Sequence, residues 1–198
     1  MLTHCGTQPI ETDRLLLRPF EPGDAPSVWA NWAGDEIVQR WYGEPVYATL
    51  EETQGLLAKY IAACESEDTY RWGVFEKSSG ECVGQVAYFL IDSKNHFGEL
   101  EYCIGRAFQR RGYCAEAVRA AMAYGFGRVR LHKIQISHKA GNESSRGVIL
   151  KCGLTYEGTL RDYFYMDGTY CDRLYYSMLE GEWKGGIHNG RELLYTEI

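Results

Sequence analysis

The chain has 198 residues, of which 45% are hydrophobic and 24% charged, a composition typical of one ordinary globular domain. Its 21 basic and 27 acidic side chains give a formal net charge of −6, which disfavours broad binding to nucleic acid or to anionic membranes. No apolar run approaches the ~18 residues of a transmembrane helix and the first residues lack the pattern of a secretory signal, so we expect a cytoplasmic protein.

The amino-terminal part of the chain predicts one strand followed by three helices. A short apolar run between turn residues predicts a strand over residues 10–19. Asp24, Asp35 and Thr49 are residue types that cap helices, and Glu52 completes a capping box with Thr49. These signals predict helices over residues 25–33, 35–39 and 49–64.

The rest of the chain predicts a sheet interrupted by two helices. Apolar runs and turn signals predict strands over residues 70–75, 82–91 and 97–104, a helix over 115–126, a strand over 132–137, a helix over 142–151, and a hairpin of 154–160 with 170–178. This order predicts an α/β or α+β fold, a mixed sheet with helices on both faces. We expect one domain over residues 1–183 and a tail over 184–198, either flexible or added as an edge strand.

A candidate anion site follows the strand that ends near Ile104, where residues 109–114 open the next helix. The first N–H groups of a helix have no carbonyl partner, and together with the helix dipole they favour an anion. Gly112 lets the backbone approach a ligand closely, and Arg110 and Arg111 add positive charge. These features suit a pyrophosphate, although a glycine turn with solvated arginines would give the same pattern. The phosphate-loop and dinucleotide fingerprints are absent, which disfavours ATPases and NAD-binding proteins.

The residues of this junction carry a family resemblance. Gln109-Arg-Arg-Gly-Tyr-Cys114 resembles the Q/R-x-x-G-x-G/A signature of the GNAT superfamily of acetyl-CoA-dependent N-acetyltransferases. The chain is similar in particular to the RimJ/RimL-like branch, through Glu11 to Phe20, Gly112 to Ala117, and Asn142 and Ser145 with the segment 151–154. The similarity spans roughly residues 10–180, and the order and spacing of the motifs make it specific.

The resemblance implies a fold and an activity. The fold would be a mixed, mostly antiparallel central sheet of about seven strands with helices on both faces. The activity would be transfer of an acetyl group from acetyl-CoA to a primary amine of a protein N-terminus or a small molecule, by direct attack in a ternary complex and without a metal. A non-catalytic acyl-CoA-binding or interaction module is the alternative. Dimers are common in the branch, so a homodimer stays open.

The resemblance also implies how the cosubstrate binds. The pantetheine arm would pair with the strand 97–104, the pyrophosphate would rest on the amides that open the next helix, and a second helix would add Asn142 and Ser145. The residues expected to bind acetyl-CoA are Cys103, Ile104, Gln109, Arg110, Arg111, Gly112, Tyr113, Cys114, Ala115, Asn142 and Ser145.

Acyl transfer needs a base for the amine and an acid for the thiolate. Glu99 and Glu101 alternate along their strand and therefore point to one face, where a carboxylate withdrawn from water is a candidate base; two solvated carboxylates are the alternative. Glu99 matches the family's glutamate in "EIGYW" and ranks before Glu101. Other GNAT enzymes carry a tyrosine that serves as general acid where this chain has Ile149, so Ser145 is the expected general acid.

Several other residues are expected to have structural roles or to line the acceptor cleft. Cys114 stands where the family has Gly or Ala, and we expect it to be a small packed residue whose place at a helix N-terminus lowers its pKa. Asn142 is equally suited to capping its helix. His132 and His138 are expected at the surface or in caps, and one or two of Trp29, Trp32, Trp41 and Tyr42 are expected to line an acceptor cleft. The seven cysteines form no CxxC pair and do not cluster with the histidines, which predicts free thiols and no metal site.

Overall fold

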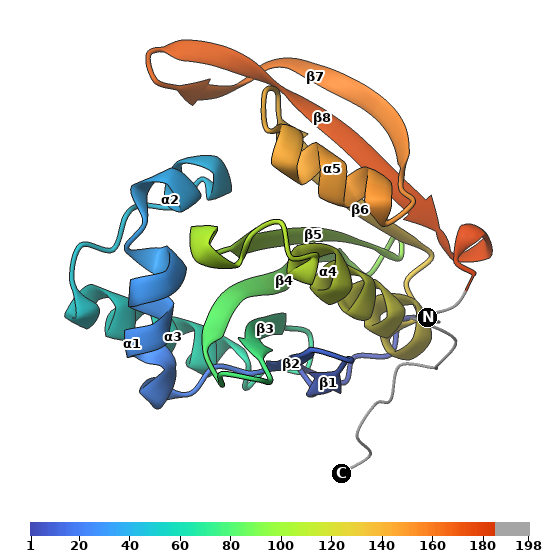
Figure 1. Cartoon of the computed structure of the whole chain (residues 1–198). Helices are drawn as coiled ribbons and strands as arrows, with labels where there is room; N and C mark the ends of the chain where they lie inside the picture. Colours follow the sequence, from blue (N-terminus) through green and yellow to red (C-terminus); the bar gives the residue numbers. More distant parts are fainter. Residues whose placement is uncertain (185–198) are drawn as a thin grey trace.

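The computed structural model describes residues 1–184, which form a mixed sheet in the order β1-β2-β3-β4-β5-β6-β8-β7 (Figure 1). The strands are β1 (Ile10–Glu11), β2 (Leu15–Arg18), β3 (Tyr70–Glu76), β4 (Cys82–Asp92), β5 (Phe97–Ile104), β6 (Lys133–Lys139), β7 (Thr155–Met166) and β8 (Thr169–Leu179). The helices are α1 (Ala25–Val28), α2 (Glu36–Tyr42), α3 (Leu50–Ala63), α4 (Tyr113–Tyr124) and α5 (Glu143–Lys151). The predicted α/β class is confirmed, with eight strands in the described sheet.

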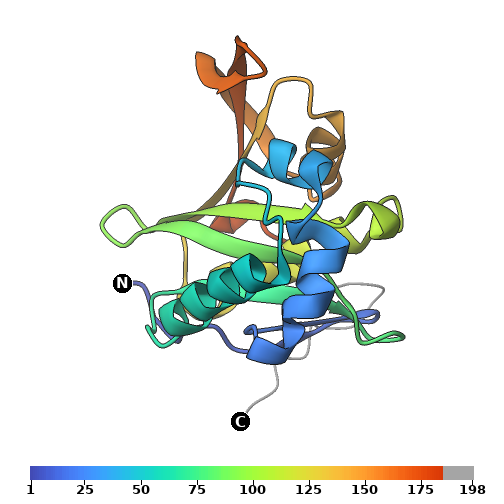
Figure 2. The same cartoon turned by 90° about the vertical axis from the view of Figure 1, so that its left-hand side faces the viewer.

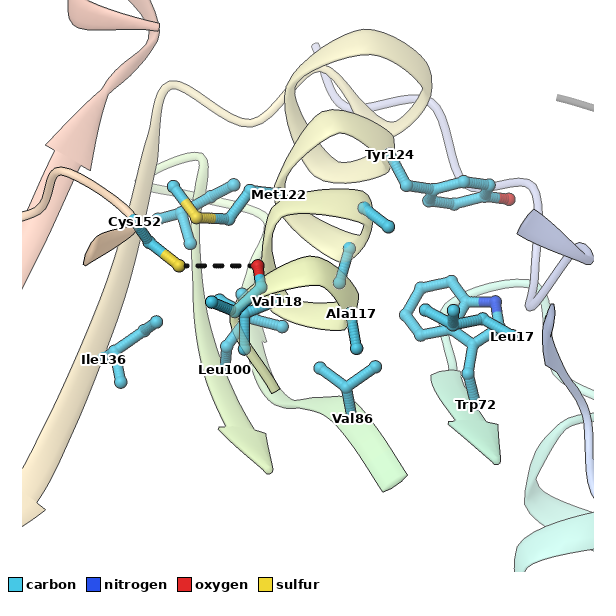
Figure 3. Close-up of a cluster of buried hydrophobic side chains, with 14 of the residues drawn as sticks. Leu17, Trp72, Val86, Leu100, Ala117, Val118, Met122, Tyr124, Ile136 and Cys152 are labelled. Carbon is cyan, nitrogen blue, oxygen red and sulfur yellow. Dashed lines mark hydrogen bonds between the residues drawn. The ribbon is translucent and has the colours of Figure 1, made fainter. Parts of the chain in front are cut away.

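The helices cover the two faces of the sheet, as Figures 1 and 2 show from two directions. On one face, α4 packs on a large apolar core with side chains from β2 to β6. Figure 3 shows this core, in which Val118 and Met122 of α4 lie over Leu100 of β5 and Ile136 of β6. On the other face, α1 and α3 enclose a second, smaller core. None of the helices in residues 1–184 is long and apolar enough to cross a membrane.

Parallel pairing between β5 and β6 covers only the first half of each strand. It runs from Phe97–Lys133 to Leu100–Ile136 and then stops. Beyond that point β5 stays paired with β4 up to Ile104, while β6 stays paired with β8 up to Lys139. The facing edges of residues 101–104 and 137–139 therefore diverge, and we call this opening the β5–β6 split.

The structure differs from the predicted elements at the first strand and at the final hairpin. The strand expected over 10–19 is divided into β1 and β2 by a turn in which the N–H of Thr12 donates to the carbonyl of Leu15 (2.9 Å). The final hairpin is longer than expected and has an irregular register between Leu160 and Phe164. The tail expected over 184–198 lies, from residue 185 onward, outside the described residues.

His138 lies neither at the surface nor in a cap, the two places expected for it from the sequence. It is a residue of β6 and only 5% exposed. It lies two residues after Ile136 and four after Ile134, so it shares their face, which packs into the large core. Its ring stacks on Tyr176 of β8.

Candidate functional site

The junction between β5 and α4 has the backbone of an anion site. A single 3₁₀ turn, Arg106–Phe108, follows β5, and Gly112 then caps α4 with a φ of 85°. Arg110 also has a positive φ of 61°. Because the first helical hydrogen bond of α4 is Glu116 N–H to Gly112 O (3.1 Å), the amides of Tyr113 to Ala115 precede the helical ladder. The chain thus presents a run of amides at the end of β5.

The side chains of this junction mostly hold it in place. The Gln109 side-chain amide donates to the carbonyl of Ile104 (2.9 Å), which ties the loop to the end of β5. The Tyr113 hydroxyl donates to Glu76, and an Arg111 guanidinium nitrogen lies 3.7 Å from the same carboxylate. Of the two arginines predicted to add charge here, Arg110 is exposed, whereas Arg111 lies near the Glu76 carboxylate.

The pKa of Cys114 shifts in the direction opposite to the one expected from its place at a helix N-terminus. Burial, reinforced by the neighbouring Cys152 and Cys103 thiols, raises the pKa of Cys114 well above its usual value. The helix N-terminus favours a thiolate, but withdrawal from water disfavours the charge more strongly. Cys114 is therefore a protonated, packed residue.

Glu99 and Glu101 point to the same face of β5, as their alternation predicts, yet each has its own arginine. Glu99 Oε1 accepts from Arg173 and from Ser137 Oγ (3.0 Å), and Oε2 accepts from the Gln135 amide (2.9 Å). With a side chain only 4% exposed, Glu99 has both oxygens occupied. The carboxylate is neither solvated nor adjacent to an unpaired one.

Glu101 is held on one side only. Its Oε1 accepts from the Tyr42 hydroxyl (2.6 Å) and from Arg71 (2.8 Å), whereas Oε2 has no hydrogen-bond partner among the described residues. The side chain is 27% exposed. Burial, followed by the charge of Glu101, raises the pKa of Tyr42 well above its usual value, so its hydroxyl remains a donor to this carboxylate.

A pair of hydroxyl groups lies on the opposite face of β5. Tyr102 Oη and Ser145 Oγ are 2.9 Å apart, which joins β5 to the first turn of α5. Asn142 caps that turn by accepting from the Ser145 N–H (3.1 Å). Burial raises the pKa of Tyr102 well above its usual value, so the phenol stays protonated. Ile149 is fully buried in the large core.

The helix α2 and the β7–β8 hairpin meet beyond the β5–β6 split (Figure 1). Arg40 of α2 forms an ion pair with Asp167 at the hairpin tip. Lys139, the last residue of β6, donates from Nζ to the carbonyl of Arg40 (2.9 Å). Its ammonium also lies 5.4 Å from the centre of the Phe164 ring.

The aromatic residues expected near an acceptor separate into distinct places. Trp32 is buried in the smaller core, and Trp29 lines a surface pocket beside Arg106. Tyr42 reaches Glu101 and so belongs to the charged face of β5. Trp41 lies 3.8 Å from the position that a Cβ on Gly141 would take.

Sequence reasoning missed Tyr102, Arg71 and Arg173 as members of the site. Tyr102 had a usable signal, because it follows Glu101 on a strand already assigned to the site. The two arginines lie on β3 and β8, and only the long-range pairing of the sheet brings them to β5.

Comparison with known proteins identifies the family and the fold. Residues 14–155 match the acetyltransferase (GNAT) domain family. The chain is 30% identical over 171 residues to the uncharacterized N-acetyltransferase YoaA of Bacillus subtilis (strain 168), covering 86% of this chain and 96% of that protein. It is 27% identical to the spermidine N(1)-acetyltransferase of Vibrio cholerae, covering 80% and 89% of the two chains. A GNAT-family acetyltransferase from Bacillus anthracis superimposes with a TM-score of 0.78 at 27% identity, covering 88% and 100%.

Proposed function

The chain belongs to the GNAT acetyltransferase family and is an acetyltransferase, and on that premise we propose that it transfers acetyl from acetyl-CoA to a primary amine by direct attack in a ternary complex. The observation that carries the proposal is the β5–β6 split opening next to the amides of the β5–α4 junction. We also propose that the activity is cytoplasmic and of the RimJ/RimL type that the sequence motifs resemble.

The split and the junction fit two chemically different parts of acetyl-CoA. The pantetheine arm contains amides and is suited to pair with an open strand edge, here at Cys103 and Ile104 of β5. The pyrophosphate is an anion suited to the amides from Gly112 to Ala115, with Arg110 adding charge. Main-chain groups supply most of these contacts, so Cys114 in place of Gly or Ala is compatible with binding.

We assign the proton acceptor to Glu101. The acceptor amine must be neutral when its nitrogen attacks the acetyl carbon, and Glu101 Oε2 is free to take the proton, directly or through water. Glu99 has no free oxygen and instead ties β5 to β6 and β8. This assignment reverses the order in which the two carboxylates rank from sequence alone.

The hydroxyl pair supplies the returning proton. As the tetrahedral intermediate collapses, the carbon–sulfur bond breaks and the CoA thiolate takes a proton from Ser145, which Tyr102 can replenish. A main-chain N–H of β5 in the split is suited to polarise the acetyl carbonyl. Tyr102 thereby places a tyrosine hydroxyl at α5 although Ile149 provides none.

A non-catalytic acyl-CoA-binding module is the second candidate, and the pairing of both carboxylates with arginine favours it. Calorimetry with coenzyme A and a free-thiol assay with acetyl-CoA separate the two. The assay uses panels of N-terminal peptides, polyamines, amino acids and aminoglycosides. Binding with thiol release supports the transferase, and binding without release over the whole panel supports the module. Absence of coenzyme A binding contradicts both.

A further inference from the structure

The charged face of β5 is electrostatically unlike the chain as a whole. Its two carboxylates, on Glu99 and Glu101, are each paired with an arginine, and so is Asp167 at the tip of the β7–β8 hairpin. A cation approaching Glu99 or Glu101 therefore meets a carboxylate whose charge is already balanced. The chain nevertheless has a net charge of −6, so the overall charge is a poor guide to the substrate here.

Lys139 is the cation of this face that has no acidic partner. Lys139 lies two residues after Ser137 on β6, so the two side chains point to the same face of the strand. Ser137 donates to Glu99, which places Lys139 on the face that carries Glu99. Its ammonium has three donors, of which the carbonyl of Arg40 takes one. No carboxylate in residues 1–184 lies within ion-pair distance of it. Burial, together with the nearby Arg40 guanidinium, lowers the pKa of Lys139, although Cys171 and Asp167 act in the opposite direction.

Lys139 and Glu101 both contact the helix α2. Lys139 contacts Arg40, and Glu101 contacts Tyr42, which lies on the same short helix α2. The proposed proton acceptor and the free ammonium are thus brought to adjacent parts of one helix. A small molecule with an amine and a carboxylate matches this pair of groups in charge.

We propose that the acceptor is a small amine that also carries a carboxylate, an amino acid or short peptide, and that Lys139 binds this carboxylate. The inference rests on the proposed function and narrows its substrate class. A polyamine would place a second cation against Lys139 instead. Glu44, which is exposed just after α2 and carries no ion pair among the described residues, is the carboxylate that a polyamine would use.

Matched substrates test the proposal. The free-thiol assay compares alanyl-alanine with alanyl-alaninamide, which differ only in the C-terminal charge, and with spermidine. We expect kcat/KM to be about tenfold or more higher for the acid than for the amide, because a charge-assisted hydrogen bond is lost. Spermidine should be the poorest of the three. Equal values for acid and amide, or a preference for spermidine, would overturn the proposal.

Variants at position 139 locate the effect. Lys139→Met should raise KM for alanyl-alanine about tenfold, leave kcat within ~3-fold, and leave the amide unchanged. Lys139→Arg keeps the charge and should restore much of the preference, which distinguishes recognition from a folding defect. Glu44→Gln is the matched control and should change neither dipeptide. Loss of the acid preference in Glu44→Gln but not in Lys139→Met would contradict the assignment.

Failure of the inference is distinguishable from failure of the proposed function. Absence of coenzyme A binding defeats the function itself. If coenzyme A binds but no amine releases thiol, the CoA-loaded protein is titrated with alanyl-alanine by calorimetry. Binding that Lys139→Met abolishes supports the carboxylate site, and no binding by the parent protein overturns it.

Discussion

The two faces of β5 are stabilised in different ways. Leu100 on one face packs into the apolar core under α4, where shape complementarity and burial decide the structure. Glu99 and Glu101 on the other face are held by arginines from β8 and β3, where charge pairing decides it. The comparison shows how one strand presents an apolar side and a charged side through residues that alternate one by one.

The largest expected effect is the loss of kcat/KM when Glu101, whose Oε2 has no partner among the described residues, is replaced. Glu101→Gln keeps an acceptor for Tyr42 but loses the proton-accepting carboxylate, and we expect kcat/KM to fall about 10³-fold. The measurement is steady-state thiol release at saturating acetyl-CoA. Glu99→Gln, measured alongside, should show the smaller loss per folded molecule. The reverse order of these two losses would return the base to Glu99.

The next effect concerns stability on the same face. Glu99→Gln leaves Arg173 buried without its carboxylate, and we expect the free energy of unfolding to fall by about 3 kcal/mol. Urea unfolding followed by tryptophan fluorescence measures it. Leu100→Ala is the matched change on the apolar face, where a 2% exposed side chain is truncated, and it should cost about 3 kcal/mol through the cavity it leaves. A stable Glu99→Gln protein would contradict the structural role of the ion pair.

A third prediction concerns the hydroxyl pair. Ser145→Ala should lower kcat about 10²-fold with little change in acetyl-CoA affinity, since the lost group acts on the leaving thiolate. Tyr102→Phe should lower kcat about tenfold, because Ser145 remains in place. Single-turnover thiol release and calorimetry with coenzyme A separate turnover from affinity. Wild-type turnover by the Ser145 variant would remove this residue from the mechanism.

The smallest effect is expected at Cys114. Because burial raises the pKa of its thiol, Cys114 should resist alkylation by iodoacetamide at pH 8 in the folded protein. Cys114→Ala should keep kcat/KM within ~3-fold, since the proposed contacts with acetyl-CoA there come from main-chain amides. Mass spectrometry of the alkylated protein measures the labelling. Rapid modification of Cys114 would show a thiolate that the structure does not favour.

Local signals predicted the framework of the site well. The Thr49–Glu52 capping box, Asp35 as a helix cap and Gly112 before α4 all act over one helical turn, so the sequence alone contains their partners. The strand alternation that sends Glu99 and Glu101 to one face is equally local.

The parts that sequence reasoning missed depend on tertiary packing. Arg71 and Arg173 reach β5 only through the pairing order of the sheet, which no short pattern encodes. The pKa of Cys114 was predicted in the wrong direction because the helix N-terminus is visible in the sequence, whereas the depth of burial is not. His138 was placed at the surface for the same reason.

The β5–β6 split has a consequence for how such a protein changes over generations. Its edges are peptide groups, which every residue except proline supplies alike, so substitutions along β5 and β6 would leave the proposed docking surface for acetyl-CoA largely intact. Acceptor choice depends instead on individual side chains around the charged face. On the proposed function, a point mutation could therefore exchange one amine for another while the binding of acetyl-CoA is kept.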